Sequence, residues 1–307
     1  MANKKLLALA LIAVLSLSSC AAGVTETAGI TTNEKTSISG MTADETADYY
    51  LSLLTSFDKK TSYDSEAARI MLNGDDADIR GDGASFEGGR LSITAGGDYV
   101  ITGVLTNGSV YVNAPDEKVH LVFCGVSITS SGEAALLVES ADKVSLTLMS
   151  GTENSLTDTV VTVGGGEHKA CVYARDDLTV NGSGTLTVTG TAKNAITCKN
   201  DLRLIGASVT VKALNNGIKA DDSMIISGCT LHVTAGKDAV KVSDDSGEND
   251  EGYIYISGGE YTLIAGDDGI QADALAVIAS GTVTTHAEGK AVNAPTKEIA
   301  DGCLIKK

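Results

Sequence analysis

The last third of the chain repeats a pattern of apolar and polar residues at a nearly fixed interval. Segments of the same form begin at Asn194, Asn216, Asp238, Asp268 and Lys290, separated by 22, 22, 30 and 22 residues. Within each repeat the apolar residues alternate with polar ones in three short pieces, which predicts β-strands rather than helices. Repeats of this size stack into solenoids. We therefore predict an all-β fold, a parallel β-helix with about 22 residues and three strands per coil.

The single longer step contains an acidic run at 244–251, which indicates an eight-residue loop added to an ordinary repeat. From residue 70 onward the alternation continues with less regular spacing, and a glycine-containing insertion near 150–169 should loop outward. Gly 34, Pro 2 and Trp 0 suit narrow turns stacked on small residues rather than a core built on aromatic side chains. We predict one solenoid domain over residues 70–307.

The first 20 residues have the form of an export signal. Lys4 and Lys5 precede an apolar stretch at 6–17, which is shorter than the roughly 20 apolar residues of a membrane span. The stretch ends in Leu-Ser-Ser-Cys, which resembles a bacterial lipobox, so Cys20 is the expected lipidation site. The alternative is an ordinary secretory signal with a chance cysteine. In the first case the mature protein is extracytoplasmic and contacts the membrane through its N-terminal lipid only.

Residues 21–69 are predicted to connect this anchor to the solenoid. The part at 21–40 is rich in Thr, Ser, Glu and Gly and indicates a flexible tether. Apolar residues recur at helical spacing over 42–57, which predicts a short amphipathic helix. This helix would either cover the open end of the solenoid or pack on its first strands.

Charge and composition exclude several classes of function. The net charge of −17 disfavours nucleic acid, and it also disfavours an acidic polysaccharide unless a metal ion reverses the local sign. Six cysteines without CxxC spacing give no zinc motif, and those inside the solenoid are expected to behave as small buried hydrophobes. The four histidines share no motif and are expected at the surface: His120, His168, His232 and His286.

The column that opens the repeats carries the most informative chemistry. It contains Asn194, Asn216, Asp238 and Asp268, with Asp267 beside the last. Carboxylates stacked about 5 Å apart repel one another unless something neutralises them. Calcium takes six to eight oxygen ligands, including carboxylates and amides. The column therefore predicts a calcium site at Asn216, Asp238, Asp267 and Asp268, with a structural ladder of side chains bonded to the backbone as the alternative.

A second acidic column follows the next strand: Asp201, Asp221, Asp222, Asp244, Asp245 and Asp273. Aspartates at turns also stabilise the chain by accepting backbone hydrogen bonds. We expect this column to bind calcium less well than the first.

Lys219 and Lys241 stand three residues after Asn216 and Asp238 and should point outward beside each other. They are either solvated surface lysines or cations that contact a sugar carboxylate, together with Asn194, beside the calcium ion. In a lyase one of them would be the base that abstracts the proton α to a uronate carboxylate.

Several stretches resemble one family. They include VHLVFCGVSITSS from residue 119, NNGIKADDSMIISG from 215 and GDDGIQAD from 266. The chain is similar over about 70–294 to the carbohydrate-binding-domain lipoproteins of anaerobic and gut bacteria. The resemblance implies a right-handed parallel β-helix, built like the family 9 pectate lyases, that carries calcium and binds cellulose-like or pectin-like polymers without established cleavage. Ala170 and Lys290 depart from the acid or amide expected in the column.

Three functions follow from these observations. The first is calcium-dependent, non-catalytic binding of a plant-type polysaccharide at the cell surface by a monomer. The second is a calcium-assisted polysaccharide lyase, and the third is a structural adhesin or spacer.

Overall fold

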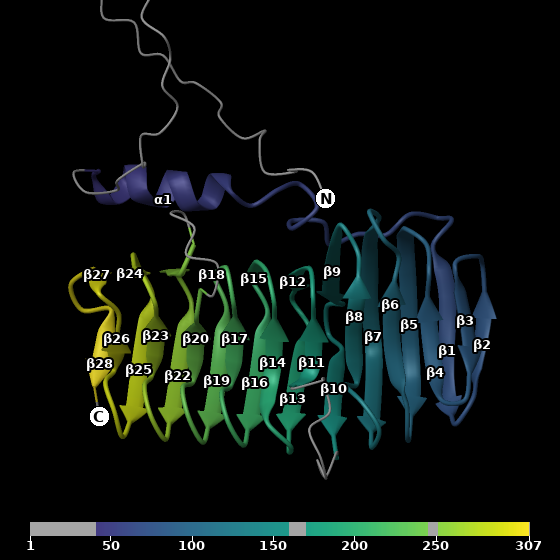
Figure 1. Ribbon diagram of the computed structural model, residues 1–307. Helices are drawn as coiled ribbons and strands as arrows, with labels where there is room; N and C mark the ends of the chain where they lie inside the picture. The colour runs from purple at the N-terminus through teal and green to yellow at the C-terminus, as the bar shows by residue number, and fades with distance from the viewer. Residues whose placement is uncertain (1–40, 160–169, 245–250, 307) are drawn as a thin grey trace, which may run out of the picture. The chain divides into compact units, whose positions relative to one another are not determined.

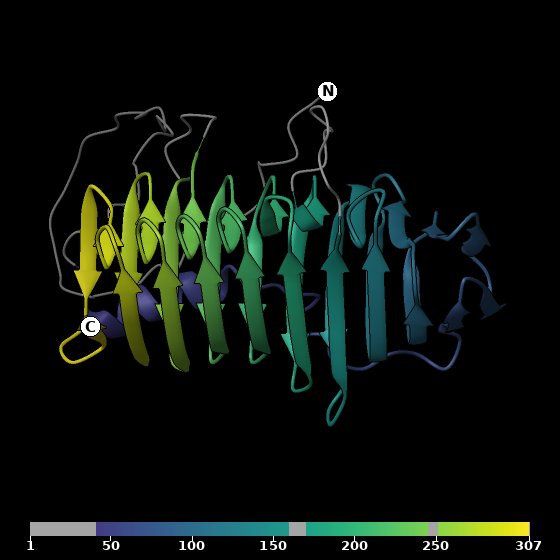
Figure 2. The same cartoon turned by 90° about the horizontal axis from the view of Figure 1, so that it is seen from below.

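The protein is nearly all-β in the computed structural model, which describes residues 41–159, 170–244 and 251–306. Almost all strands pair in parallel with the equivalent strand of the next coil, so they stack into long sheets (Figure 1, Figure 2). This solenoid has the form of a parallel β-helix, as the alternation predicted. The right-handed sense and a uniform coil length stay predictions. The signal sequence with Cys20, the tether and His168 lie outside the described residues.

The strands form three rows, each running the length of the solenoid. The first row consists of β1 (Ala68–Gly74), β5 (Gly97–Leu105), β7 (Lys118–Ser130), β9 (Lys143–Leu148), β12 (Asp177–Gly182), β15 (Leu202–Ile205), β18 (Ser223–Ser227), β21 (Tyr253–Ser257), β24 (Leu275–Ile278) and β27 (Thr296–Ile299). The second row continues from the long strand β7 into β10 (Glu153–Asp158), β13 (Thr185–Gly190), β16 (Ser208–Ala213), β19 (Thr230–Ala235), β22 (Glu260–Ala265), β25 (Thr282–Ala287) and β28 (Leu304–Lys306).

The third row is a separate ten-stranded sheet. It consists of β3 (Ala84–Glu87), β4 (Arg90–Ile93), β6 (Ser109–Asn113), β8 (Leu136–Ser140), β11 (Ala170–Ala174), β14 (Asn194–Cys198), β17 (Ile218–Ala220), β20 (Val240–Val242), β23 (Ile270–Ala272) and β26 (Val292–Asn293). The strand β2 (Ala77–Arg80) pairs antiparallel with β1, and β3 pairs antiparallel with β4. These two strands cover the N-terminal edge of the parallel sheets.

Strand register in the third row follows the repeats of the sequence. Ile196 pairs with Ile218, Ile218 with Val240 and Val240 with Ile270, which gives steps of 218−196 = 22, 240−218 = 22 and 270−240 = 30 residues. The longer step holds the acidic run, of which residues 245–250 lie outside the described ranges. Pairing continues unchanged on both sides of it, so the added residues leave the stack intact.

The interior consists of columns of small branched side chains. Ile218, Val240 and Ile270 are at most 1% exposed, and equivalent residues stack above and below them. Burying one such side chain contributes about 1.5–3 kcal/mol. At one corner Gly206 and Gly228 occupy equivalent positions with φ of 65° and 64°, a left-handed conformation that favours glycine. Because successive side chains of a strand point to opposite faces, the polar residues that alternate with these buried ones face outward.

The predicted helix exists, but it lies elsewhere than expected. Helix α1 (Ala43–Ser52) begins at a capping box formed by Thr42 and Glu45 and ends five residues before the predicted end at 57. Tyr50 and Leu54 pack against outward-facing Ile225, Tyr255 and Val277 of the first row. The helix therefore lies on the side of late coils (Figure 1), neither over the open end nor on the first strands.

Residues 43–64, which we call the strap, cover the outer face of the first row. After the helix, the buried carboxylate of Asp58 accepts hydrogen bonds from Thr179 and Lys143 at 2.5 and 3.0 Å. Asn181 donates to the backbone carbonyl oxygens of Asp58 and Lys60, each at 2.9 Å. Burial alone would raise the pKa of Asp58, but Lys143 and the hydroxyl donors outweigh it, so the pKa lies below its ordinary value of 3.8. The strap is thus held by charge-assisted hydrogen bonds.

The expectation that the histidines lie at the surface is wrong for His120. His232 and His286 are exposed, but His120 is 0% exposed beneath the strap. Its Nδ1 lies 3.2 Å from Asp98 Oδ1, and its Nε2 lies 2.8 Å from Thr147 Oγ1. Burial lowers the pKa of His120, against the opposing effect of Asp98. The alternation of β7 correctly turned His120 outward, but it did not show that another segment covers that face.

The cysteines of the solenoid are free thiols. Cys171, Cys198, Cys229 and Cys303 are buried, and Cys124 is half-buried. Burial raises the pKa of Cys229 to about 11, so its thiol stays protonated at neutral pH. These residues pack as small hydrophobes, as the sequence indicated.

Candidate functional site

The column of amides and carboxylates lies at the corner where each coil enters the third row. Asn194, Asp238 and Asp268 are buried, with 8, 3 and 6% of each residue exposed, and Asn216 is half-buried. Ala170 pairs with Asn194 at one end, so the column ends there as the sequence indicated. Each residue of the column stands two positions before an inward-facing residue of the third row. Because Ile218, Val240 and Ile270 pair in register, the column residues before them also stack at the corner.

A ladder of hydrogen bonds connects these side chains to the backbone of the next coil. The Oδ1 atom of each residue accepts from the N–H of its successor. The distances are 3.1 Å from Asn194 to Asn216, 3.3 Å from Asn216 to Asp238, 3.1 Å from Asp238 to Asp268 and 2.7 Å from Asp268 to Lys290. This is the structural ladder that the sequence left open, and an amide serves it as well as a carboxylate.

Three carboxylates nevertheless gather at one point of the ladder. Asp238, Asp267 and Asp268 can each place one oxygen within 4.8 Å of the others, and we call them the acidic cluster. Asp267 is exposed, so the cluster opens to solvent. Like charges at this spacing repel one another, and contact with water on one side weakens this repulsion only in part. Asn216, the fourth predicted ligand, lies one coil away and uses its Oδ1 in the ladder.

The second oxygen atoms of the two buried carboxylates also have partners. Lys241 Nζ lies 2.8 Å from Asp238 Oδ2. Asn293 Nδ2 donates to Asp268 Oδ2 at 2.6 Å. Within the described residues, the ammonium group of only one lysine, Lys241, therefore contacts the three carboxylates. The cluster keeps an excess of negative charge that a cation would neutralise.

The two lysines lie beside each other, but they have different partners. Lys219 pairs with Lys241 in register, as predicted. Lys219 Nζ lies 2.6 Å from Asp221 Oδ1, whereas Lys241 turns toward Asp238. Only Lys241 therefore belongs to the acidic cluster.

Asn293 was missed as a functional residue. It pairs in register with Gln271, which pairs with Lys241, so it occupies the same outward position one coil beyond the cluster. The 22-residue step from Gln271 to Asn293 is the sequence signal that would have found it. The terminal coil thus contributes a donor to Asp268 even though Lys290 replaces the acid of the column.

Two members of the second acidic column have cationic partners, and Asp245 lies outside the described residues. Asp201 pairs with Arg203 at 2.9 Å and accepts a hydrogen bond from Ser223. Asp221 contacts both Lys199 and Lys219. These pairs leave little unbalanced charge at Asp201 and Asp221, and the weaker calcium binding expected for this column stays a prediction.

Comparison with known proteins adds independent information. The model of carbohydrate-binding domain-containing proteins matches residues 87–303. The chain belongs to this family. A carbohydrate-binding domain-containing protein of Acetivibrio thermocellus is 32% identical over 246 residues, which are 78% of this chain and 86% of the relative. The match supports a polysaccharide partner.

A solved structure of the same architecture is also similar. It is the polysaccharide lyase-like protein from C. thermocellum, solved as a gadolinium derivative, with 35% identity and a TM-score of 0.75. The match covers 78% of this carbohydrate-binding domain-containing protein and all of the other chain. In the described ranges, no helix has the length and hydropathy of a membrane span.

Proposed function

We propose that the protein binds polysaccharide without cleaving it, and that calcium held by the acidic cluster is required. The observation that carries this proposal is the meeting of three carboxylates at a solvent-open corner with a single lysine among them. The family supplies the class of ligand. The metal and the plant-type polymer, cellulose or polygalacturonate, are our inference.

The residues present fit calcium by their chemistry. The donor set consists of oxygen atoms from Asp238, Asp267 and Asp268, with the amide of Asn216 one coil away, and calcium prefers such ligands. The related polysaccharide lyase-like protein took up gadolinium, an ion that also prefers oxygen ligands. Because Lys241 and Asn293 contact the two buried carboxylates, metal binding should displace at least one of them.

Bound calcium would make this corner able to hold an acidic sugar. A polymer with carboxylate groups is repelled by a protein of net charge −17 unless a cation intervenes. A displaced Lys241 and the neighbouring Lys219 would then offer donors to the sugar from adjacent coils, whereas the buried amide of Asn194 donates to Thr197 Oγ1 at 3.0 Å.

A lyase is the second candidate, because the similar solved structure is described as polysaccharide lyase-like. The geometry argues against it, since each lysine donates to a carboxylate of its own coil, two or three residues away, instead of standing free to act as a base. A lyase would release unsaturated product that absorbs ultraviolet light. Such absorbance, lost in a Lys241→Ala variant, would replace binding by catalysis as the function.

A spacer or adhesin is the third candidate, because the ladder satisfies its own hydrogen bonds without a metal. A glycan array, probed with and without a chelator, separates calcium-dependent binding from the spacer. Retention that the chelator abolishes supports the proposal. Retention of acidic glycans that ignores the chelator makes the metal structural only, and no retention of any glycan leaves the spacer.

We also propose that the protein is attached to the outside of a bacterial membrane through a lipid on Cys20. The support is the lipobox-like sequence before this residue. Cys20→Ala should move the protein from the membrane fraction to the soluble fraction, and unchanged attachment would exclude lipidation.

A further inference from the structure

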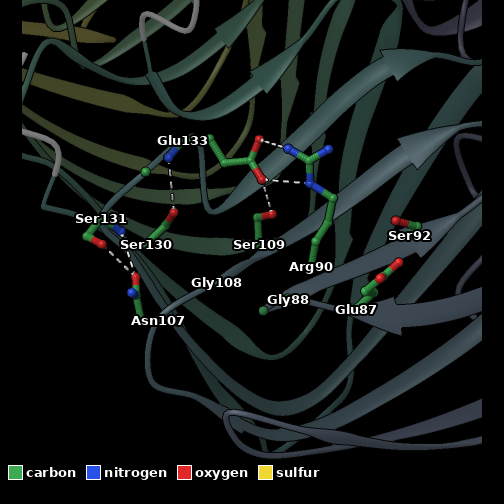
Figure 3. Close-up of a pocket in the computed structure, with 12 residues that line it drawn as sticks. Glu87, Gly88, Arg90, Ser92, Asn107, Gly108, Ser109, Ser130, Ser131 and Glu133 are labelled. Carbon is green, nitrogen blue, oxygen red and sulfur yellow. Dashed lines mark hydrogen bonds and ion pairs between the residues drawn. The ribbon is translucent and has the colours of Figure 1, made fainter.

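A second polar cavity lies at the N-terminal end of the third row, in a different place from the acidic cluster. It has a volume of about 650 Å³ and opens between the turn at 87–90, the loop at 107–109 and the loop at 130–133 (Figure 3). These three segments come from three successive coils. The loop at 130–133 precedes β8, at the same corner of the coil as Asp267 precedes β23. From β8 to β20 there are four strand spacings, which is roughly 19 Å.

The cavity is built around an arginine and a glutamate. Arg90 Nε and Nη2 donate to Glu133 Oε1 and Oε2 at 3.0 and 2.6 Å, a bidentate pair that Figure 3 shows. Glu133 also accepts from the hydroxyl of Ser109. The Arg90 guanidinium lies over the ring of Tyr111, 4.7 Å from its centroid. Both charged groups are therefore held in place before any ligand arrives, which lowers the entropy cost of binding.

Glycines keep the cavity open. A Cβ atom added at Gly88 or at Gly132 would meet nothing within 4 Å, so both border empty space. A Cβ at Gly108 would collide with the carbonyl oxygen of Gly89, so here the backbones of two coils approach too closely for any side chain. On the opposite side, Asn107 Oδ1 accepts from the N–H and the hydroxyl of Ser131 at 3.1 and 2.8 Å, which fixes the two loops to each other.

The charges of the cavity favour a neutral ligand. Glu133 already neutralises Arg90, and Glu87 adds a further negative charge, so an anionic sugar gains nothing here. Arg90 Nη1 has no acceptor among the described residues, which leaves two N–H groups for a ligand. The hydroxyls of Ser92 and Ser109 also line the cavity, and hydroxyls both donate and accept. A surface with donors and acceptors and no net positive charge suits the hydroxyl groups of a sugar.

We propose that this cavity is a second carbohydrate subsite, which binds neutral, hydroxyl-rich sugar residues without a metal. This inference rests on the proposed function in one respect, which is that the ligand is a polysaccharide. One extended polymer that follows the corner of the solenoid would reach this subsite and the acidic cluster together. The protein would then hold a polymer with neutral and acidic sugars more tightly than either subsite alone.

The test is calorimetric titration with cellohexaose in the presence of a chelator. Gly132→Phe should fill the cavity, because this residue has no positive φ and its Cβ would meet open space. Arg90→Ala removes the donors, and losing hydrogen bonds to a charged group weakens binding about tenfold or more. The matched control is Arg175→Ala, which breaks a similar half-exposed pair with Glu139 at 3.0 Å outside the cavity. The control should bind as the wild type does.

The outcomes separate this inference from the proposed function. Chelator-resistant binding of cellohexaose that both cavity variants weaken, with unchanged thermal unfolding of Gly132→Phe, supports the subsite. Equal binding by the wild type and Gly132→Phe overturns it, as does binding that requires calcium. If the wild type ignores cellohexaose but retains oligogalacturonate with calcium, the subsite is excluded and the proposed function stands. If the wild type binds cellohexaose but does not retain oligogalacturonate with calcium, only the calcium site is excluded.

Discussion

The outer face of the first row and the corner before the third row both carry stacked polar side chains, but the strap covers only the first. Beneath the strap, Asp58 meets a lysine and hydroxyl groups, and every charge there has a close partner. At the open corner, Asp267 and its two neighbours share a single lysine. The comparison indicates that a covered polar row stabilises the fold, whereas an open and unbalanced row is available to a ligand.

The largest expected effect concerns Asp58 beneath the strap. Asp58→Ala leaves the largely buried Lys143 ammonium with only the more distant carboxylate of Asp177, at 3.5 Å, and breaking a buried pair costs about 3 kcal/mol. Urea unfolding monitored by circular dichroism measures the loss. Asp64→Ala is the control, because the side chain of Asp64 is 83% exposed, and its stability should stay within about 0.5 kcal/mol of the wild type. Equal stability of the two variants would contradict the role of the strap.

The next effect tests the open corner with calcium. A ligand at 100 times its dissociation constant stabilises the folded state by about 2.7 kcal/mol, so calcium should raise the unfolding temperature of the wild type. Asp238→Asn and Asp268→Asn should lose this gain, because an amide preserves the ladder but not the charge. Asp201→Asn, paired with Arg203 elsewhere, should keep most of it. An unchanged wild type in millimolar calcium would leave the column as a ladder only.

A smaller effect is the pH dependence that His120 gives to the covered row. Burial lowers the pKa of His120, so the folded state keeps it neutral, while the unfolded state takes up a proton near the ordinary value of 6.5. Stability is therefore fully present above pH 6.5 and falls below it, by up to about 1.4 kcal/mol per pH unit. Asp98, Lys60 and Asp64 are the charged groups that face the ring.

Urea unfolding at pH 7, 6 and 5 measures this dependence. His120→Gln should flatten the profile, and His232→Gln, at an exposed position, should not. The covered carboxylates act in a lower range. The pKa of Asp98 is lowered because the hydrogen bonds from Lys60 and Asp64 outweigh burial, so its contribution is lost only as the pH falls below 3.8. A slope between pH 7 and 5 that survives in His120→Gln would assign it to another group.

The smallest effect on stability is expected for Lys241. Lys241→Met removes a partly exposed ion pair and should change the free energy of unfolding by less than about 1 kcal/mol. The same change removes a cation that competes with the metal, so calcium affinity should rise several-fold in calorimetric titration. Lys219→Met is the matched control, because its partner Asp221 lies outside the cluster. Weaker calcium binding by Lys241→Met would show that this lysine supports the site.

The repeats predicted the strands well because the alternation of inward and outward residues is a local property. The repeat, with its 30-residue step interpreted as one coil plus a loop, also placed Asp238, Asp267 and Asp268 on adjacent coils, and the structure brings them together. The same step, applied once more, would have reached Asn293. The periodicity of the sequence therefore predicted both the coarse fold and the position of the candidate site.

The remaining features depend on contacts between residues that no period connects. Alternation turns His120 outward, yet only the path of the strap, about 60 residues earlier, decides that it is buried. The antiparallel strands β2 and β3 cover the N-terminal edge, and an open end of the solenoid was one of the two places predicted for the helix. The pair of Arg90 and Glu133 joins irregular early coils 43 residues apart, where no repeat predicts which side chains meet.

The 30-residue step between Val240 and Ile270 distinguishes the inward positions, which strand pairing fixes, from the corner, which accepts added residues. Extra residues at that corner leave Ala220 opposite Val242, and they leave Met224 opposite Ile254. Corners of the solenoid should therefore accept grafted or lengthened loops while the inward columns stay fixed. Such a loop would change the surface at that corner without any change in the interior.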